Sequence, residues 1–153
     1  MTIILKNKAT LKFDDFYFKC SIGKKGLTKK KIEGDKKTPI GIFSLGALYY
    51  RSDRNFKPLT KLKCVKIKKV MGWCDDIKSK KKYNKMINVS QKLRHEKLYR
   101  KDHKYDLMII INYNTKKTKL GKGSAIFLHL TDNYKPTAGC IALKKKDFLI
   151  LSK

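Results

Sequence analysis

The sequence has no apolar run long enough to cross a membrane. Its first residues, Met1 to Lys6, turn polar too soon to form the core of a signal peptide. Taken literally, these two features predict a protein that stays in the cytoplasm.

Acidic residues are scarce: 12 Asp and Glu stand against 39 Lys and Arg, which gives a net charge of +27. Such a charge favours attraction to a polyanion such as nucleic acid, an anionic cell wall or a membrane surface. However, only four of the basic residues are arginine, the residue on which specific nucleic-acid readers rely. We therefore favour solvated surface lysines, typical of an A/T-rich genome, over a specific nucleic-acid partner. The lysine-rich segment 28–37 is predicted to be a solvated loop of this kind.

Histidine and cysteine are also few, and their spacing matches no common metal site. None of the four cysteines forms a Cys-x-x-Cys pair or flanks a His-x-x-x-His, so we expect no zinc and no other cofactor. Cys20 and Cys64 alternate with apolar residues, which is typical of buried small side chains. A disulfide between two of the cysteines stays open. His95 and His103 lie among charged residues and are interpreted as surface histidines.

The 153 residues, 41% of them hydrophobic, are enough for one domain, residues 1–153, with a core that needs no staples. Short alternating or apolar runs predict a mainly β protein. Ser90 resembles a helix N-cap for residues 91–100, and residues 144–153 are predicted to form a terminal helix with Phe148 and Leu151 on one face. The predicted strands cover residues 2–5, 10–13, 16–22, 38–45, 47–50, 63–67, 105–113, 124–130 and 139–143.

The stretch from His129 to Cys140 is the strongest candidate for a chemical site. A cysteine attacks a carbonyl only as thiolate and needs a neighbouring base or cation, and histidine serves as either near neutral pH. His129 ends a predicted buried strand, and Cys140 follows a loop that closes on Gly139. Gly139 permits a tight turn, so the amides of Gly139 and Cys140 can point at one spot as an oxyanion hole does. The alternative is that Cys140 is a buried small residue and His129 a strand-end histidine.

Further candidates come from rare residues elsewhere in the chain. Arg51 and Arg54 either pair with Asp53 and other surface acids or bind a substrate carboxylate near a cleft. Trp73, the only tryptophan, either packs in the core or walls a pocket. Asn114, which begins the turn after the most apolar strand, completes this set of candidate substrate-binding residues.

Several motifs together resemble the YkuD-type L,D-transpeptidase catalytic domain, in a short single-domain bacterial form. The first is a histidine, a loop and then Thr-x-Gly-Cys-Ile, from His129 to Ile141. In that motif, Thr137 is a further candidate for substrate binding. The other matching segments are Lys-Thr-Pro-Ile-Gly-Ile-Phe at 37–43, Arg-Ser-Asp-Arg at 51–54, Gly-Trp-Cys-Asp-Asp at 72–76 and Gly-Ser-Ala-Ile-Phe-Leu-His at 123–129.

The resemblance implies a mainly β fold, a β-sandwich or mixed sheet with one or two short helices, and a catalytic cysteine in a cleft. It implies peptidoglycan stem peptides as substrates, with Cys140 as nucleophile and His129 as general base and acid. Transfer of the acyl group to an amine makes a 3→3 cross-link that serves cell-wall organisation and cell shape, whereas transfer to water makes the enzyme an L,D-carboxypeptidase or thiol amidase. A basic polyanion-binding protein with an inactive site is the third alternative.

Two positions depart from the commoner family pattern. Ala138 stands where a second histidine is usual, and Ala142 stands where arginine or asparagine is usual. These differences leave substrate recognition open more than the nucleophile. The family also implies a place in the periplasm or cell envelope, in contrast to the expectation from the N-terminus. We expect a monomer that anionic cell-wall polymers attract.

Overall fold

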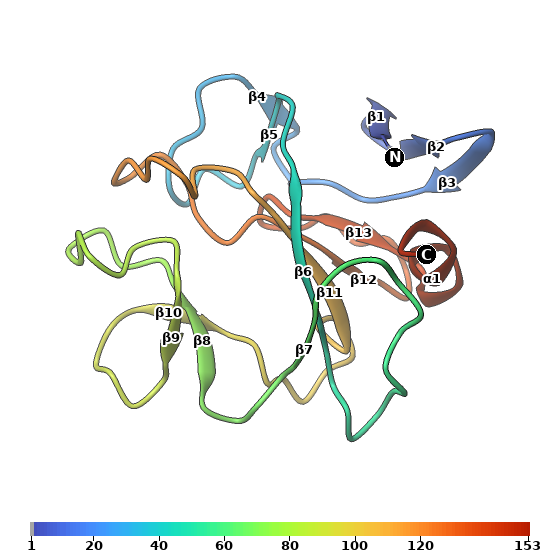
Figure 1. Cartoon of the computed structure of the whole chain (residues 1–153). Coiled ribbons are helices and arrows are strands. Elements are labelled where there is room, and N and C mark those ends of the chain that lie inside the picture. Colours follow the sequence, from blue (N-terminus) through green and yellow to red (C-terminus); the bar gives the residue numbers. More distant parts are fainter. Residues whose placement is uncertain (1) are drawn as a thin grey trace.

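A computed structural model describes residues 2–153. Its centre is a five-stranded sheet in the order β13-β12-β11-β6-β7, in which β11 runs antiparallel to both neighbours. The pairs β12–β13 and β6–β7 are parallel. Figure 1 shows this sheet running through the middle of the molecule. The strands are β6 (Leu45–Tyr50), β7 (Cys64–Lys66), β11 (Leu107–Ile111), β12 (Phe127–Leu130) and β13 (Ile141–Leu143).

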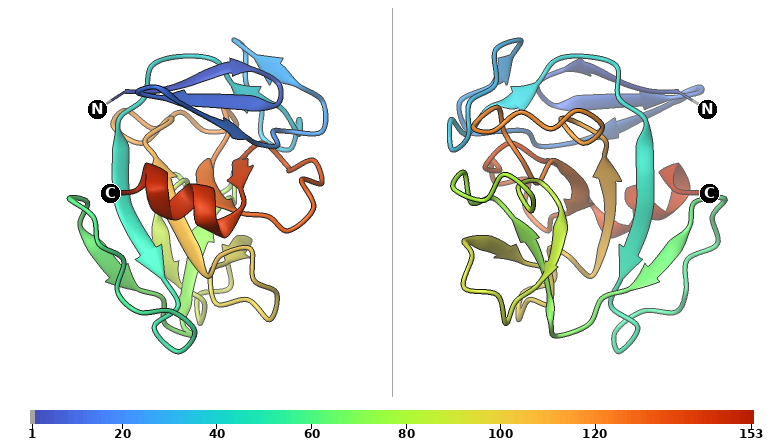
Figure 2. Two further views of the ribbon diagram at one scale, coloured as in Figure 1. Left: turned by 90° about the vertical axis from the view of Figure 1, so that its right-hand side faces the viewer. Right: turned by 60° about the vertical axis from the view of Figure 1, so that its left-hand side comes forward.

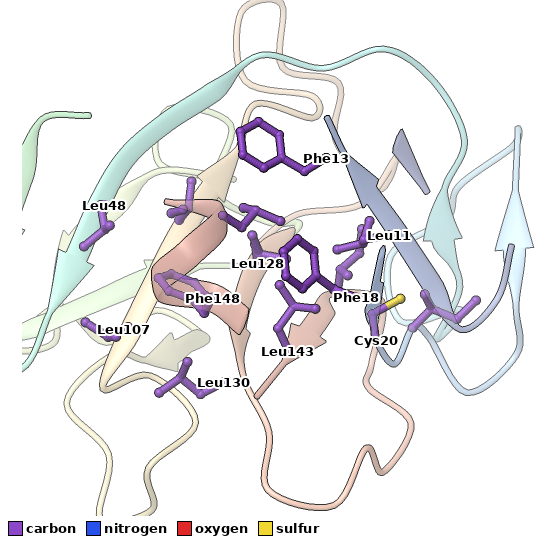
Figure 3. Close-up of a cluster of buried hydrophobic side chains, with 14 of the residues drawn as sticks. Leu11, Phe13, Phe18, Cys20, Leu48, Leu107, Leu128, Leu130, Leu143 and Phe148 are labelled. Carbon is purple, nitrogen blue, oxygen red and sulfur yellow. The ribbon is translucent and has the colours of Figure 1, made fainter. Parts of the chain in front are cut away.

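One face of this sheet packs against the N-terminal sheet and the helix α1 (Lys145–Leu151). Because side chains alternate along a strand, Leu128 and Leu130 of β12 share this face and meet Phe148 of α1. Figure 3 shows these side chains meeting those of the N-terminal sheet, and Figure 2 shows that sheet lying beside α1. The N-terminal sheet consists of β1 (Ile3–Asn7), β2 (Thr10–Phe13) and β3 (Phe16–Lys19), all antiparallel.

The opposite face carries a second core, built from Met108 and Phe127 of the central sheet together with Cys140, Trp73 and Leu98. A small antiparallel sheet in the order β10-β8-β9 covers this face. In Figure 1 it lies on the other side of the central sheet from α1. Its strands are β8 (Met71–Cys74), β9 (Met86–Asn88) and β10 (His95–Lys97).

A short parallel pair, β4 (Leu27–Thr28) and β5 (Thr38–Pro39), holds the segment between them against the loop that precedes β13. The buried Thr38 hydroxyl donates a hydrogen bond to the Gly139 carbonyl at 2.8 Å and accepts one from the Gly23 amide at 2.9 Å. The backbones approach so closely that a Cβ on Gly23 would lie 2.5 Å from the Lys36 carbonyl oxygen. The segment 31–37 is therefore fastened beside Cys140.

The mainly β class is confirmed, as are the central position of the strand around 107–111 and the terminal helix. The predicted helix at 91–100 is wrong, because its centre forms strand β10 instead. There Glu96 pairs with Trp73, and Leu98 is completely buried. Burial of one leucine and pairing with β8 outweigh a weak local preference for helix.

Candidate active site

Cys140 lies directly before β13, on the face of the central sheet that bears the second core. The parallel register pairs Leu128 with Ile141, which brings Cys140 beside Phe127. The Phe127 amide donates a hydrogen bond to the Cys140 sulfur at 3.4 Å, and the thiol donates one to the Ala125 carbonyl at 3.2 Å. Two strands and the segment before β12 thus fix the position of the sulfur.

Burial raises the pKa of the Cys140 thiol to about 12. The hydrogen bond from the Phe127 amide favours the thiolate, and so does the positive charge of Lys31, whereas the negative charge of Glu96 disfavours it. At neutral pH the resting side chain is therefore a thiol. Nucleophilic attack requires a base that takes its proton or a positive charge that stabilises the thiolate.

His129 shares this face of the sheet, since it lies two residues after Phe127 on β12. Its Nδ1 atom lies 2.8 Å from the Leu130 carbonyl oxygen, which can only accept a hydrogen bond, so Nδ1 carries the proton and Nε2 keeps its lone pair. Burial lowers the pKa of His129 to about 4, so the ring is neutral. Within residues 2–153, no hydrogen bond joins His129 to the Cys140 sulfur. The structure therefore places a neutral imidazole on the same sheet face as the thiol, without a hydrogen bond between them.

Tyr105 contacts His129 and also lines the pocket that contains Cys140. Its ring packs edge-on against His129, with centroids 5.3 Å apart, and against Phe127 at 5.8 Å. The Tyr105 hydroxyl donates to Glu96 at 3.2 Å. Tyr105 and Glu96 both line a pocket of about 270 Å³ beside Cys140.

The lining of this pocket carries charges of both signs together with small residues at and around Cys140. Such a lining suits a ligand that itself bears both amine and carboxylate groups. The small residues are Ala125, Ala138, Gly139 and Cys140. The positive side chains are Lys31, Lys36 and Arg94, and the negative ones are Glu33, Asp75 and Glu96.

Gly139 is one of the two predicted oxyanion-hole donors, and its position in the backbone accommodates no residue with a side chain. Its φ is +141°, and a Cβ on it would lie 2.9 Å from the Lys37 carbonyl oxygen. Its amide donates to the Thr137 hydroxyl at 3.1 Å, and this hydroxyl donates in turn to the Cys140 carbonyl at 2.6 Å. Thr137 thus shapes the turn before Cys140, and its hydroxyl accepts the hydrogen bond of the Gly139 amide.

Arg51 is buried away from the pocket. Its guanidinium donates to both carboxylate oxygens of Asp53, at 2.8 and 2.7 Å, and to the Arg100 carbonyl at 2.6 Å. It also stacks on the Tyr99 ring at 3.5 Å. Of the two interpretations of this arginine, the structure shows the ion pair with Asp53. Arg54 likewise pairs with an acid, Asp106, at 2.9 Å.

Trp73 and Asn114 do not line the pocket either. Trp73 packs edge-on against Phe127 in the second core, and its indole N–H donates to Asn84 at 2.9 Å. The Asn114 side chain holds a turn, donating to the Lys119 and Gly123 carbonyls, each at 2.9 Å.

Lys31, Glu96 and Tyr105 are pocket residues that the sequence did not single out. The prediction that residues 28–37 form a solvated loop is wrong for Lys31, which is buried. Pairing with Asp35 compensates for the burial of its charge. Glu96 and Tyr105 reach the pocket only because β10 pairs with β8 and because the segment before β11 passes close by.

The remaining cysteines take no part in the pocket. All four cysteines are unpaired, and burial raises the pKa of Cys20 to about 11. Among residues 2–153, no three His, Cys, Asp or Glu side chains are grouped as metal ligands would be. The described chain also holds no helix with the length and apolar character that crossing a membrane requires.

A family model described as YkuD, the L,D-transpeptidase catalytic domain, matches residues 2–152. Neither the curated proteins nor the solved structures include a significant match to the chain. The family match covers the central sheet, both cores and the pocket beside Cys140. The chain therefore belongs to the YkuD family of L,D-transpeptidase catalytic domains.

Proposed function

We propose that this protein is a cysteine-dependent L,D-transpeptidase that acts on peptidoglycan stem peptides, with Cys140 as nucleophile and His129 as general base and acid. One observation carries the proposal. Cys140 lines a pocket with charges of both signs, and a neutral histidine lies on the same face of the sheet. Membership of the family supports the reaction class.

In the first half-reaction, Nε2 of His129 takes the thiol proton, and the thiolate attacks the carbonyl carbon of the third stem residue. A C–S bond forms and the carbonyl becomes an oxyanion, which the backbone amide of Cys140 stabilises. The oxyanion then collapses and the C–N bond to the terminal D-alanine breaks. His129 returns its proton to the leaving amine, so a thioester on Cys140 and free D-alanine remain.

In the second half-reaction, the amine of a neighbouring stem attacks the thioester. His129 takes a proton from this amine, the C–S bond breaks and the new amide is the 3→3 cross-link. The thiolate regains its proton from His129. With water in place of the amine, the same acyl-enzyme releases a free acid, so the acceptor decides between transpeptidase and L,D-carboxypeptidase.

The charges around the pocket support a stem peptide as ligand. A diamino-acid residue carries an amine and a carboxylate. The pocket offers Lys36 for the carboxylate and Glu33 for the amine, beside the ion pair of Arg94 with Asp75. The net charge of +27 additionally favours approach to anionic cell-wall polymers, and hence a place in the cell envelope.

Mass spectrometry after incubation with a disaccharide tetrapeptide tests the proposal. We expect loss of D-alanine and an acyl group on the peptide that contains Cys140. Cys140→Ala should lose the adduct, whereas Cys64→Ala, at a partly buried cysteine outside the pocket, should keep it. An adduct that persists in Cys140→Ala would contradict the nucleophile assignment.

Added acceptor amine separates the two acyl acceptors. A dimer that appears only with the amine supports the transpeptidase, while release of tripeptide at an unchanged rate supports the carboxypeptidase. Salt-sensitive binding to nucleic acid without any thiol acylation would instead favour a polyanion-binding protein with an inactive site.

A further inference from the structure

Lys31 is a buried cation in the wall of the pocket that contains Cys140. Its side chain is only 4% exposed. Burying a lysine this deeply costs free energy unless a nearby group interacts favourably with its charge. By contrast, Arg94 in the same pocket has a side chain that is 60% exposed and pairs with Asp75. Solvent screens the charge of Arg94 much more than that of Lys31.

Two glycines make room for the Lys31 side chain. A Cβ on Gly123 would lie 2.6 Å from Cγ of Lys31 and 3.0 Å from its Cε, so no larger residue fits without displacing the lysine. A Cβ on Gly139 would lie 3.6 Å from Nζ. The lysine thus extends along the backbone before β12 and places its ammonium beside the residue that precedes the nucleophile.

The ammonium is held but not saturated. It pairs with Asp35 and lies 3.4 Å from the Ile32 carbonyl. Among residues 2–153 these two acceptors use two of its three N–H donors. Asp35 is held independently by the amides of Ile32 and Lys37, at 3.0 and 2.9 Å. The carboxylate therefore stays in place, and its charge offsets part of the charge of Lys31.

The other two cations of the pocket, Lys36 and Arg94, are exposed to solvent, and the remaining groups around Cys140 supply no positive charge to its sulfur. His129 is neutral, and Tyr105 is a buried phenol whose pKa is raised by burial. Glu96 is paired with Arg100 at 3.0 Å, and its negative charge disfavours the thiolate. Lys31 is the remaining buried cation whose field favours ionisation of the thiol.

We infer that Lys31 is a positioning residue for the nucleophile: its buried ammonium, moderated by Asp35, stabilises the Cys140 thiolate. This inference rests on the proposed role of Cys140 as the nucleophile. The low dielectric of the pocket strengthens the attraction between the two charges. His129 thus removes the proton from the thiol, and the positive charge of Lys31 stabilises the resulting thiolate.

The pH dependence of Cys140 alkylation tests this role without any peptidoglycan substrate. Iodoacetamide is uncharged and reacts with thiolates, and the peptide that contains Cys140 can be followed by mass spectrometry. In Lys31→Met we expect the midpoint of the rate profile to rise by about one pH unit, with alkylation near neutral pH about tenfold slower. Lys31→Arg keeps the charge and should restore part of the effect.

Asp35→Asn supplies a test with the opposite sign. It removes the counter-charge and leaves Lys31 in place, so the midpoint should fall and alkylation should become faster. A disturbed loop would instead change both variants in the same direction. Lys30→Met is the matched control: it removes one exposed lysine next to Lys31 and should leave the profile unchanged.

Unchanged midpoints in folded Lys31→Met and Asp35→Asn would overturn the inference, and so would shifts of the same sign. If Lys31→Met does not fold, Asp35→Asn alone decides the result. Failure of the proposed function is recognised separately. In that case wild-type Cys140 is alkylated with the expected profile, yet it gains no acyl group from the tetrapeptide.

Discussion

The hydroxyl of Thr38 donates a hydrogen bond to the carbonyl of Gly139 at 2.8 Å, although 101 residues separate them in the sequence. The same hydroxyl accepts the Gly23 amide at 2.9 Å. One buried side chain thus joins the Thr-Pro segment, the turn that begins at Gly23 and the loop that carries Cys140. The position of the loop before Cys140 is therefore tied to residues far from it in sequence.

Thr38→Val should lower the free energy of unfolding by about 1–3 kcal/mol, because it leaves the Gly139 carbonyl and the Gly23 amide without their buried partner. Urea denaturation measures this change. Thr118→Val is the control, since that hydroxyl makes only a local bond to the Thr115 carbonyl at 3.2 Å. Equal decreases in the free energy of unfolding of the two variants would show that the long-range hydrogen bond contributes no more than a local one.

Gly139→Ala should destabilise the protein more than Gly121→Ala does. Both glycines have positive φ, +141° and +71°, so both substitutions strain the backbone. Only at Gly139 does the new Cβ also meet a backbone atom, the Lys37 oxygen at 2.9 Å, whereas Gly121 has nothing within 4 Å. We expect about 1 kcal/mol at Gly121 and clearly more at Gly139, measured by thermal unfolding. Gly139→Ala should also slow acylation of Cys140, and normal acylation would speak against the importance of this turn.

His129 should make the protein less stable in mild acid. Its pKa is lowered from the ordinary 6.5 to about 4 in the folded state, so between these values the unfolded chain binds the extra proton. The contribution of the neutral His129 to the free energy of unfolding is fully present above pH 6.5. It is lost as the pH drops toward 4, by about 3 kcal/mol for a pKa shift of this size. His129→Gln should flatten this part of the pH–stability curve, and His103→Gln, at a mostly exposed histidine, serves as control. An identical slope in wild type and His129→Gln would contradict the burial of a neutral ring.

Phe148→Ala should cost about 3–5 kcal/mol, because the ring is fully buried between α1 and the central sheet. Ile150→Ala on the same helix should cost much less, since that side chain is 42% exposed. Denaturation by guanidinium compares the two variants directly. Similar losses would mean that α1 does not pack on the sheet as described.

Much of the central sheet could be predicted from local pattern. The β-branched run in 105–113 signals a buried strand by itself, because such residues fit a pleated sheet with both faces covered. The terminal helix follows from the spacing of Phe148 and Leu151. Cys140 and Gly139 were found from their motif, and both line the pocket.

The segment 91–100 shows where local pattern fails. It resembles a helix by its cap and its few spaced leucines, yet β10 forms because β8 offers a pairing edge and a core for Leu98. Arg51 shows the same limit for a polar residue. Its guanidinium could reach a cleft or a carboxylate, and only the folded chain places it on Asp53 and the Arg100 carbonyl.

The sequence by itself determined the family, the nucleophile candidate and the apolar, β-branched run that forms a central strand with two buried faces. Those features are local, since side-chain periodicity and a glycine–cysteine turn act over a few residues. Only the tertiary structure decided which charges surround the thiol. Lys31 lies in a run of similar lysines, and it differs from Lys30 because two distant glycines and Asp35 make a buried place for its ammonium. Burial and electrostatic strength depend on neighbours brought together by folding, and a sequence of lysines carries no local sign of them.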